Sequence, residues 1–251
     1  MRTIRAFFRM VASATIVVGA TVVILLLSIV PVKRRGVRLS AWCFSWGVHL
    51  LMPALGLHFR CDKPERVLQH RGFVFVNHLS FFDTLVMAYL LPVRFLAKAE
   101  VRHWPFIGWI ASATGTLYVD RNNRTARKEA RHVVADALHA NPYPPLVVFP
   151  EGTTNPYETL LPFRQGVFEI AVSAGIPYLL CAIVYERPDV VTWHSREEGL
   201  LTTVKRLVMH DGSRVRLIPL DVIDPSPDDD AQQLAEEARE IVGEALRTAS
   251  P

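Results

Sequence analysis

The chain has 251 residues, of which 50% are hydrophobic and 21% charged, and its formal net charge at pH 7 is +4. This length and composition fit one sizeable folded domain and exclude a disordered or collagen-like chain. The first 60 residues hold eight Lys and Arg and no acidic residue, whereas the remainder holds 20 basic and 24 acidic residues. A nucleic-acid-binding domain is usually basic across its folded surface, so we expect no nucleic-acid partner. Three widely spaced cysteines match neither a zinc site nor a disulfide framework, which favours a reducing compartment.

An apolar N-terminal segment, residues 10–32, runs for 23 residues without a charge. As a helix it would be about 35 Å long, enough to cross a hydrocarbon core of about 30 Å. It continues directly into Lys33-Arg34-Arg35 without the small-residue site at which a signal peptide is cleaved. We therefore expect an uncleaved membrane anchor. A second apolar stretch, residues 40–57, is shorter and contains Pro53.

Basic residues flank the first apolar segment at both ends. Positive charge favours the cytoplasmic, anionic surface of a membrane, so a pair of helices lying in one leaflet accounts for both flanks. A single transmembrane span is the alternative. We expect residues 1–58 to form membrane-attachment helices and residues 59–251 to form one folded domain.

The part of the chain beyond residue 60 alternates short β-like runs with helical patterns. This alternation predicts an α/β fold, a mixed central sheet flanked by helices, preceded by the hydrophobic helix or helix pair. The predicted strands cover residues 73–76, 93–97, 116–119, 146–149, 178–184 and 215–220. Apolar residues at three- and four-residue spacing predict helices between residues 123 and 140 and after residue 230.

Several familiar site motifs are absent from the sequence. It contains no G-x-G-x-x-G, no phosphate loop ending in Gly-Lys-Ser/Thr, no G-x-S-x-G and no H-E-x-x-H. Nucleotide hydrolysis, Rossmann redox chemistry, α/β-hydrolase catalysis and zincin proteolysis therefore lose support.

A histidine and an aspartate lie where the predicted strand 73–76 opens into a loop and a helix. His78 follows the strand closely, and Asp83 falls in the first turn of the helix. A loop of this length can fold back so that the Asp83 carboxylate accepts the Nδ1–H of His78. Nε2 is then free to act as a general base. The alternative is a capped helix start with an incidental histidine.

Two further blocks follow predicted strands. One is Phe149-Pro150-Glu151-Gly152-Thr153, and the other is the run from Gly115 to Arg121. In α/β sheets the ligand crevice lies at the carboxyl ends of the strands, so these turns point to the same edge as His78. Taken alone, Glu151 could equally be a turn carboxylate that accepts nearby backbone amides.

Together, in this order, the three blocks resemble the glycerolipid acyltransferases typified by bacterial 1-acylglycerol-3-phosphate acyltransferase. The resemblance covers about residues 73–180. It implies transfer of an acyl group from acyl-CoA or acyl carrier protein, as substrate, to a lysolipid hydroxyl in the membrane, without a bound cofactor or metal. It also implies attachment to the lipid bilayer, with the catalytic domain on the cytoplasmic side of a bacterial inner membrane.

The resemblance assigns roles to individual residues. It implies that His78 is the general base and Asp83 orients it. The implied substrate-binding residues are Arg121, which contacts a phosphate, the acceptor-positioning residues Glu151, Gly152 and Thr153, and the basic residues Lys98 and Arg164.

Two positions depart from the family pattern. Thr154-Asn155 stand where Arg-Ser commonly follows the third block. Ile176-Pro177 correspond to a fourth block of the family, in which Leu180 stands where a second proline is usual. The missing cation weakens the case for a phosphomonoester acceptor. A lyso-ornithine lipid or a lysophospholipid with a capped headgroup therefore remains an alternative to 1-acylglycerol-3-phosphate.

The blocks also bear on mechanism. They contain no cysteine, and Ser80 lies only two residues from His78, so a covalent acyl-enzyme has no evident nucleophile. We expect direct transfer in a ternary complex. The rival functions are thioester hydrolysis at the same pair of residues and a non-catalytic, membrane-bound lipid-binding or scaffold protein.

Overall fold

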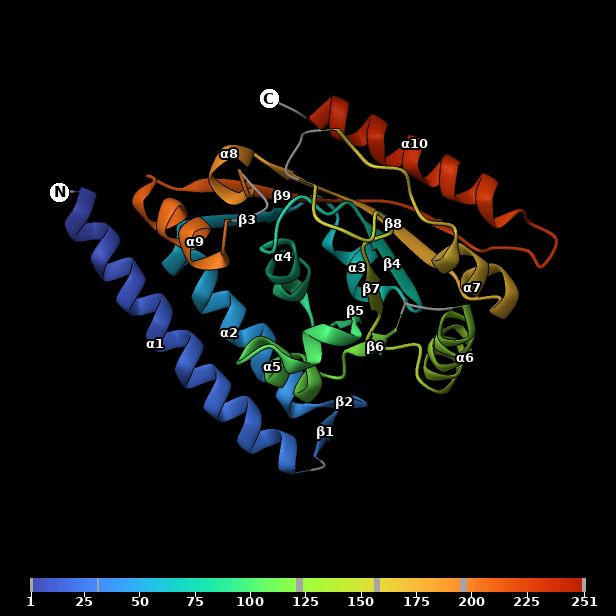
Figure 1. Ribbon diagram of the computed structural model, residues 1–251, viewed down its shortest axis with the longest axis horizontal. Helices are drawn as coiled ribbons and strands as arrows, with labels where there is room; N and C mark the ends of the chain where they lie inside the picture. The colour runs from blue at the N-terminus through green and yellow to red at the C-terminus, as the bar shows by residue number, and fades with distance from the viewer. Residues whose placement is uncertain (1, 31, 121–123, 156–158, 195–197, 250–251) are drawn as a thin grey trace.

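A seven-stranded mixed sheet forms the centre of the protein in the computed structural model, which describes residues 2–30, 32–120, 124–155, 159–194 and 198–249 (Figure 1). The strand order is β3-β9-β8-β4-β7-β5-β6, and every neighbouring pair is parallel except β8 and β9. The strands are β3 (Leu57–Cys61), β4 (Phe73–Val76), β5 (Arg94–Lys98), β6 (Leu117–Val119), β7 (Leu146–Val148), β8 (Tyr178–Tyr185) and β9 (Ser213–Ile223).

Both faces of the central strands are buried, because helices cover the sheet on both sides. On β4, Phe73 and Phe75 enter one core, whereas Val74 and Val76 enter the other. All four side chains are fully buried. This period-two division explains why the strand has a continuous apolar sequence rather than an alternating one.

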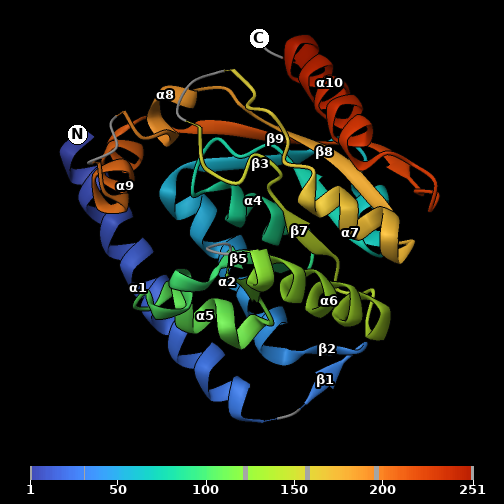
Figure 2. The ribbon, with the colours of Figure 1, turned by 45° about the vertical axis from the view of Figure 1, so that its right-hand side comes forward.

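One face of the sheet is covered by three helices. They are α6 (Arg124–Ala140), α7 (Gly166–Ala174) and α10 (Ala231–Ala249). Val134 and Leu138 of α6 and Val242 of α10 belong to the core on this side. Figure 2 shows α6 and α7 side by side, with α10 further along the sheet.

The other face carries the remaining helices, which include the apolar N-terminal pair. They are α1 (Arg2–Ile29), α2 (Leu39–Leu55), α3 (Pro64–Gln69), α4 (Asp83–Leu90), the 3₁₀ helix η1 (Ala99–His103), α5 (Ile107–Thr114), α8 (Pro188–Val191) and α9 (Leu200–Met209). A small hairpin of β1 (Lys33–Arg34) and β2 (Val37–Arg38) joins α1 to α2. The two long helices consequently run side by side (Figure 1).

Helix α1 is, within the described residues, the one helix long and apolar enough to cross a membrane. Its exposed stripe includes Ile4, Phe8, Val11, Val22 and Leu26. These positions share one side of a 3.6-residue helix. Such a lipid-like surface on an N-terminal helix fits membrane association.

The structure confirms the predicted fold class and all six predicted strands, with ends shifted by at most a few residues. It adds β3, which the sequence analysis did not predict, as the edge strand beside β9. The expected boundary at residue 58 lies inside β3. Val48 and Met52 of α2 are also part of the core beneath the sheet. The N-terminal helices are thus packed into the domain rather than joined to it by a linker.

Candidate active site

Two adjacent parallel strands bring the first and third sequence blocks together. Phe75 of β4 pairs with Val148 of β7, and both strands end within one residue of this pair. His78 and Glu151 therefore leave the sheet at the same edge. The backbone N–H of His78 donates to Oε1 of Glu151 at 2.7 Å, and the N–H of Asn155 donates to the His78 carbonyl at 3.0 Å.

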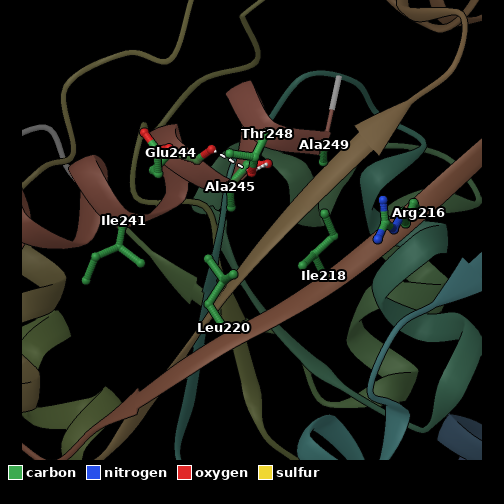
Figure 3. A pocket seen from close by; sticks show the side chains of 8 residues that line it. All are labelled: Arg216, Ile218, Leu220, Ile241, Glu244, Ala245, Thr248 and Ala249. Carbon is green, nitrogen blue, oxygen red and sulfur yellow. Dashed lines mark hydrogen bonds between the residues drawn. The ribbon is translucent and has the colours of Figure 1, made fainter. Parts of the chain in front are cut away.

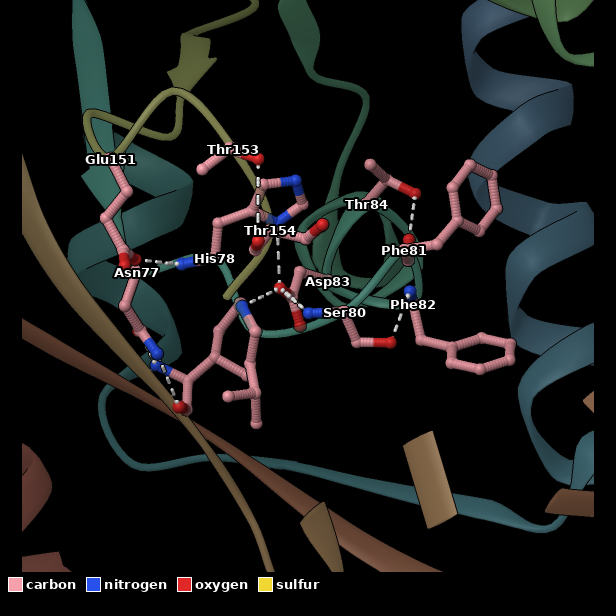
Figure 4. Close-up of polar contacts among 12 residues, drawn as sticks. Asn77, His78, Ser80, Phe81, Phe82, Asp83, Thr84, Glu151, Thr153 and Thr154 are labelled. Atoms are coloured by element: carbon pink, nitrogen blue, oxygen red, sulfur yellow. Dashed lines mark hydrogen bonds and ion pairs between the residues drawn. The ribbon is translucent and has the colours of Figure 1, made fainter. Parts of the chain in front are cut away.

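The predicted His–Asp pair is present (Figure 4). Nδ1 of His78 lies 2.9 Å from Oδ2 of Asp83, and Asp83 is fully buried at the start of α4. Because an ionised carboxylate only accepts hydrogen bonds, this contact places the proton of a neutral imidazole on Nδ1. Nε2 then carries the lone pair that a general base needs.

The Asp83 carboxylate is surrounded by donors. Oδ2 also accepts the backbone N–H groups of Leu79 at 2.7 Å and Ser80 at 2.8 Å, and Oδ1 accepts the hydroxyl of Tyr185 at 2.7 Å. Burial, the Asp83 charge and this hydrogen bond raise the pKa of Tyr185 well above its ordinary value, so the phenol stays protonated and donates. These bonds fix the carboxylate that orients His78.

The outer side of the His78 ring stays accessible. The ring stacks on Phe149 with a centroid distance of 3.9 Å, and the side chain of His78 is 16% exposed. No partner for Nε2 lies within the described part of the chain. The site therefore holds the imidazole by one nitrogen and one face and leaves the other nitrogen for a substrate.

Glu151 has a structural contact that the sequence analysis raised only as an alternative. It is 4% exposed, and its Oε2 accepts the N–H of Leu161 at 3.0 Å, while Oε1 accepts the N–H of His78. Burial raises the pKa of Glu151, although the two backbone donors oppose that shift. Its carboxylate thus fixes the backbone that carries His78, and acceptor positioning by Glu151 stays a prediction.

Gly152 allows the third block to turn tightly against Arg164. Its φ is +75°, and a Cβ atom there would lie 2.6 Å from Nε of Arg164. That Nε donates to the Glu151 carbonyl at 3.2 Å. Arg164 is exposed beside the turn, and the hydroxyl of the exposed Thr153 lies 3.5 Å from the Thr154 carbonyl. Arg164 thus lies where an anionic substrate group could reach it.

The structure describes one of the other two predicted basic residues. Lys98 ends β5 at the same edge of the sheet, two strands from β4, and is exposed. Arg121 lies outside the described residues, so its predicted contact with a phosphate stays a prediction.

The nucleophiles needed for a covalent intermediate are unsuitable. The Ser80 hydroxyl donates to the Val191 carbonyl at 2.5 Å and is buried away from the imidazole. Burial raises the pKa of the Cys61 thiol to about 11 and also raises those of Cys43 and Cys181. A thiol is nucleophilic as its thiolate. These contacts favour direct transfer.

A hollow on the far side of the sheet takes no part in this site. It has a volume of about 350 Å³ and lies between β9 and the end of α10 (Figure 3). None of the predicted site residues that the structure describes lines it; its walls include Ile218, Leu220 and Ile241.

Comparison with known proteins identifies the family. The acyltransferase family pattern matches residues 58–184, a segment that contains both the His–Asp pair and the Glu151 turn. The lyso-ornithine lipid O-acyltransferase of Pseudomonas aeruginosa is 36% identical over 227 residues, which are 89% of this chain and 83% of the relative. The chain belongs to the acyltransferase family. It is an O-acyltransferase of lipid metabolism.

Other relatives agree with this assignment. The 1-acyl-sn-glycerol-3-phosphate acyltransferase of Neisseria meningitidis serogroup B is 25% identical over 238 residues, covering 83% of this chain and 91% of the relative. The crystal structure of the 1-acyl-sn-glycerophosphate acyltransferase PlsC from Thermotoga maritima superimposes with a TM-score of 0.73. At 20% identity it covers 99% of this chain and 97% of its own, which shows a common fold.

One residue that contacts the His–Asp pair of the acyltransferase is not predictable from its sequence. Tyr185 is the last residue of β8, which lies two strands from β7 and the Glu151 turn. No sequence motif marks this tyrosine. It is brought to Asp83 because β8 pairs with β4 and then continues past the end of that strand. Asn77 supports this arrangement: its side chain accepts the Ile183 N–H at 2.7 Å and donates to the Ile183 carbonyl at 3.1 Å.

Proposed function

We propose that the acyltransferase moves a fatty acyl group from an acyl thioester to a hydroxyl of a membrane lysolipid, with His78 as general base. The geometry that carries this proposal is the Nδ1–Asp83 bond of 2.9 Å together with the accessible outer side of the imidazole. The reaction uses acyl-CoA or acyl carrier protein as substrate and needs no bound cofactor.

The proposed step balances without a covalent acyl-enzyme. Nε2 of His78 takes the proton of the acceptor hydroxyl as its oxygen attacks the thioester carbonyl. The new C–O bond forms, the C–S bond breaks, and the proton goes from His78 to the leaving thiolate. Asp83 stabilises the transient imidazolium through Nδ1–H. A positioned base of this kind contributes about 10²–10⁴ in rate.

For the acceptor, we propose a lyso-ornithine lipid. The relative that is 36% identical bears that name, whereas the relative named for 1-acyl-sn-glycerol-3-phosphate is 25% identical. Thr154 and Asn155 provide no cation after the Glu151 turn, and Arg164 is the cation beside it. One cation suits the carboxylate of an ornithine headgroup better than the double charge of a phosphomonoester. 1-acylglycerol-3-phosphate is the second candidate.

A matrix of donors and acceptors tests these assignments. Purified protein should be supplied with acyl-CoA or acyl carrier protein carrying a labelled chain, and with lyso-ornithine lipid, 1-acylglycerol-3-phosphate or no acceptor. Diacyl ornithine product that is absent in a folded His78→Ala protein supports the proposal. Diacyl glycerophosphate instead identifies the second candidate. Free fatty acid without diacyl product would establish a hydrolase, and no turnover would favour the scaffold function.

We propose that α1 and α2 lie in one leaflet and that the catalytic domain faces the cytoplasm. Helix α1 packs on α9 near its start and on α5 further along, and it pairs with α2. At the start of α1, Arg9 donates to the His210 carbonyl at 2.8 Å, and Arg5 forms an ion pair with Asp211. Since the domain holds α1 along its length, a perpendicular crossing would draw α5 and α9 into the membrane as well.

Extraction and labelling experiments test the attachment. The full-length protein should stay on membranes in high salt and in alkaline carbonate, because its apolar contact outweighs screenable charge attraction. A cysteine introduced at Lys33 should react with an impermeant reagent from the cytoplasmic side alone. Release by salt, or labelling from the opposite side, would contradict the in-leaflet arrangement.

A further inference from the structure

Three large aromatic side chains project from the short connection between η1 and α5 and from the first turn of α5. Trp104, Phe106 and Trp109 are 46%, 47% and 50% exposed. The rings of Phe106 and Trp109 contact each other, with centroids 5.3 Å apart. We call residues 104–109 the aromatic turn. An exposed cluster of this kind marks a surface that meets another apolar phase.

The backbone of the aromatic turn is held in a strained shape. Phe106 has φ +60° and ψ −55°, a conformation that a bulky residue rarely adopts. A Cβ at Gly108 would lie 2.4 Å from the Arg102 carbonyl, so only glycine fits that approach. The Gly108 N–H donates to the Trp104 carbonyl at 2.9 Å. Backbone strain of this kind clusters at active sites, ligand clamps and switch regions.

The position of the aromatic turn links the apolar helices to the active-site edge. η1 starts directly after Lys98, at the end of β5, on the edge of the sheet where the His78 loop emerges. Helix α5 then packs against both α1 and α2, and the buried Ser40 hydroxyl of α2 donates to the Ala113 carbonyl of α5 at 2.7 Å. Figure 2 shows α5 beside α1.

The neighbouring side chains match a membrane surface in both polarity and charge. On α2, Trp46 and Leu50 are exposed, which adds to the apolar stripe of α1. Arg102 and His103 immediately precede the aromatic turn, and the Arg102 guanidinium lies 5.7 Å from the ring centre of Tyr118. Tryptophan favours the interface between lipid headgroups and acyl chains, and basic residues favour anionic headgroups.

We propose that the aromatic turn inserts into the interface of an anionic bilayer and holds the active-site edge against it, so that a lysolipid acceptor reaches His78 without leaving the membrane. This inference rests on the proposed function in taking the acceptor to be a bilayer lipid. Helices α1 and α2 can attach the protein to the membrane without the aromatic turn, so the role proposed for this turn is a separate one.

Quenching by brominated lipid tests the insertion directly. Full-length protein should be reconstituted in vesicles of phosphatidylglycerol and phosphatidylcholine with bromine in the upper acyl chain. Bromolipid should strongly quench the tryptophan emission of the wild type. In the Trp104→Phe/Trp109→Phe variant, the emission that bromolipid quenches should be smaller by the contribution of these two indoles. If the quenched emission is the same with and without these two indoles, the aromatic turn lies outside the lipid and the inference is wrong.

Activity supplies the second measurement. The triple variant Trp104→Ser/Phe106→Ser/Trp109→Ser should lose about tenfold or more of its activity on acceptor embedded in vesicles and keep its activity on a short-chain, water-soluble acceptor. The matched control is Val133→Ser, which removes a 54% exposed apolar side chain from α6 on the other face of the sheet. It should leave both activities unchanged.

Failure of the insertion inference and failure of the proposed function would give different results. Equal loss on both acceptors would show that the aromatic turn supports the fold of the site, which contradicts insertion as its role. Absence of any transferase activity in the wild-type protein would contradict the proposed function. The bromolipid measurement would then still decide whether the aromatic turn enters the membrane.

Discussion

The hydroxyl of Tyr185 donates to Oδ1 of Asp83 at 2.7 Å, on the opposite carboxylate oxygen from the one that His78 contacts. Both Tyr185 and Asp83 are buried. The charges of His78 and Asp83 in turn act on the nearby Glu151 carboxyl, in opposite directions. The tyrosine is therefore linked to His78, the proposed base, through the aspartate.

Replacing this tyrosine should change the pH dependence of the reaction. Tyr185→Phe removes one donor, so the Asp83 carboxylate attracts a protonated imidazole more strongly. The acidic limb of the pH–rate profile should move to higher pH. We also expect kcat to fall about tenfold. That loss corresponds to about 1.4 kcal/mol, which is within the range of free energies that an unsatisfied buried acceptor costs. Tyr178→Phe, at a buried tyrosine facing the other core, is the control. A lower kcat with an unmoved limb would show a packing effect alone.

Removing the proposed base should abolish most turnover. We expect His78→Ala to lower kcat by about 10²-fold or more while the circular dichroism spectrum stays that of the wild type. Asp83→Asn should be similarly severe, because an amide cannot accept from both the imidazole and the two backbone donors in the same way. Near-normal turnover by a folded His78→Ala protein would refute the mechanism.

Glu151 can be tested for its two possible roles by separating kcat from KM. In Glu151→Gln, one of the two backbone N–H groups, from His78 or Leu161, faces an amide NH₂ instead of an acceptor. If the carboxylate chiefly holds the His78 loop, kcat should fall about tenfold or more and the KM for the acceptor should change little. A large rise in that KM with kcat preserved would instead assign Glu151 to acceptor binding.

Gly152 should be intolerant of a side chain. Gly152→Ala places a Cβ at φ +75° and 2.6 Å from Nε of Arg164, so the guanidinium must move from the Glu151 carbonyl. Left-handed backbone alone costs about 1–2 kcal/mol for alanine. We expect lower stability and several-fold lower activity. Gly166→Ala, where no atom lies within 4 Å of the new Cβ, should be neutral in both measurements.

His70 should make the protein less stable in mild acid. Burial lowers its pKa, and its Nε2 lies 2.6 Å from the Phe73 carbonyl. Since the folded pKa lies below the unfolded value of 6.5, the unfolded state binds more protons as the pH falls below 6.5. The free energy of unfolding should therefore decrease from pH 7 towards pH 5, and His70→Gln should reduce that slope. Thermal unfolding at several pH values measures it; an unchanged slope would contradict the assignment.

The local sequence determined the helices and strands and the turns that carry His78 and Glu151. Phe73–Val76 is uniformly apolar and is followed at once by His78, so its strand and the residues at its end are predictable from short-range pattern. The spacing of His78 and Asp83 also predicts their contact, because a helix start five residues after the histidine returns the carboxylate to it. These predictions need no knowledge of distant segments.

Tertiary structure alone decided which distant groups complete the site. The contact of Tyr185 with Asp83 depends on the pairing of β8 with β4 across 102 residues of sequence, and the Leu161 N–H reaches Glu151 from ten residues further along the chain. The sequence also left β3 unrecognised, since its alternation of exposed His58 and Arg60 spans five residues and is separated from an apolar helix by Gly56 alone. Side-chain contacts between strands depend on sheet order and register, which local periodicity does not encode.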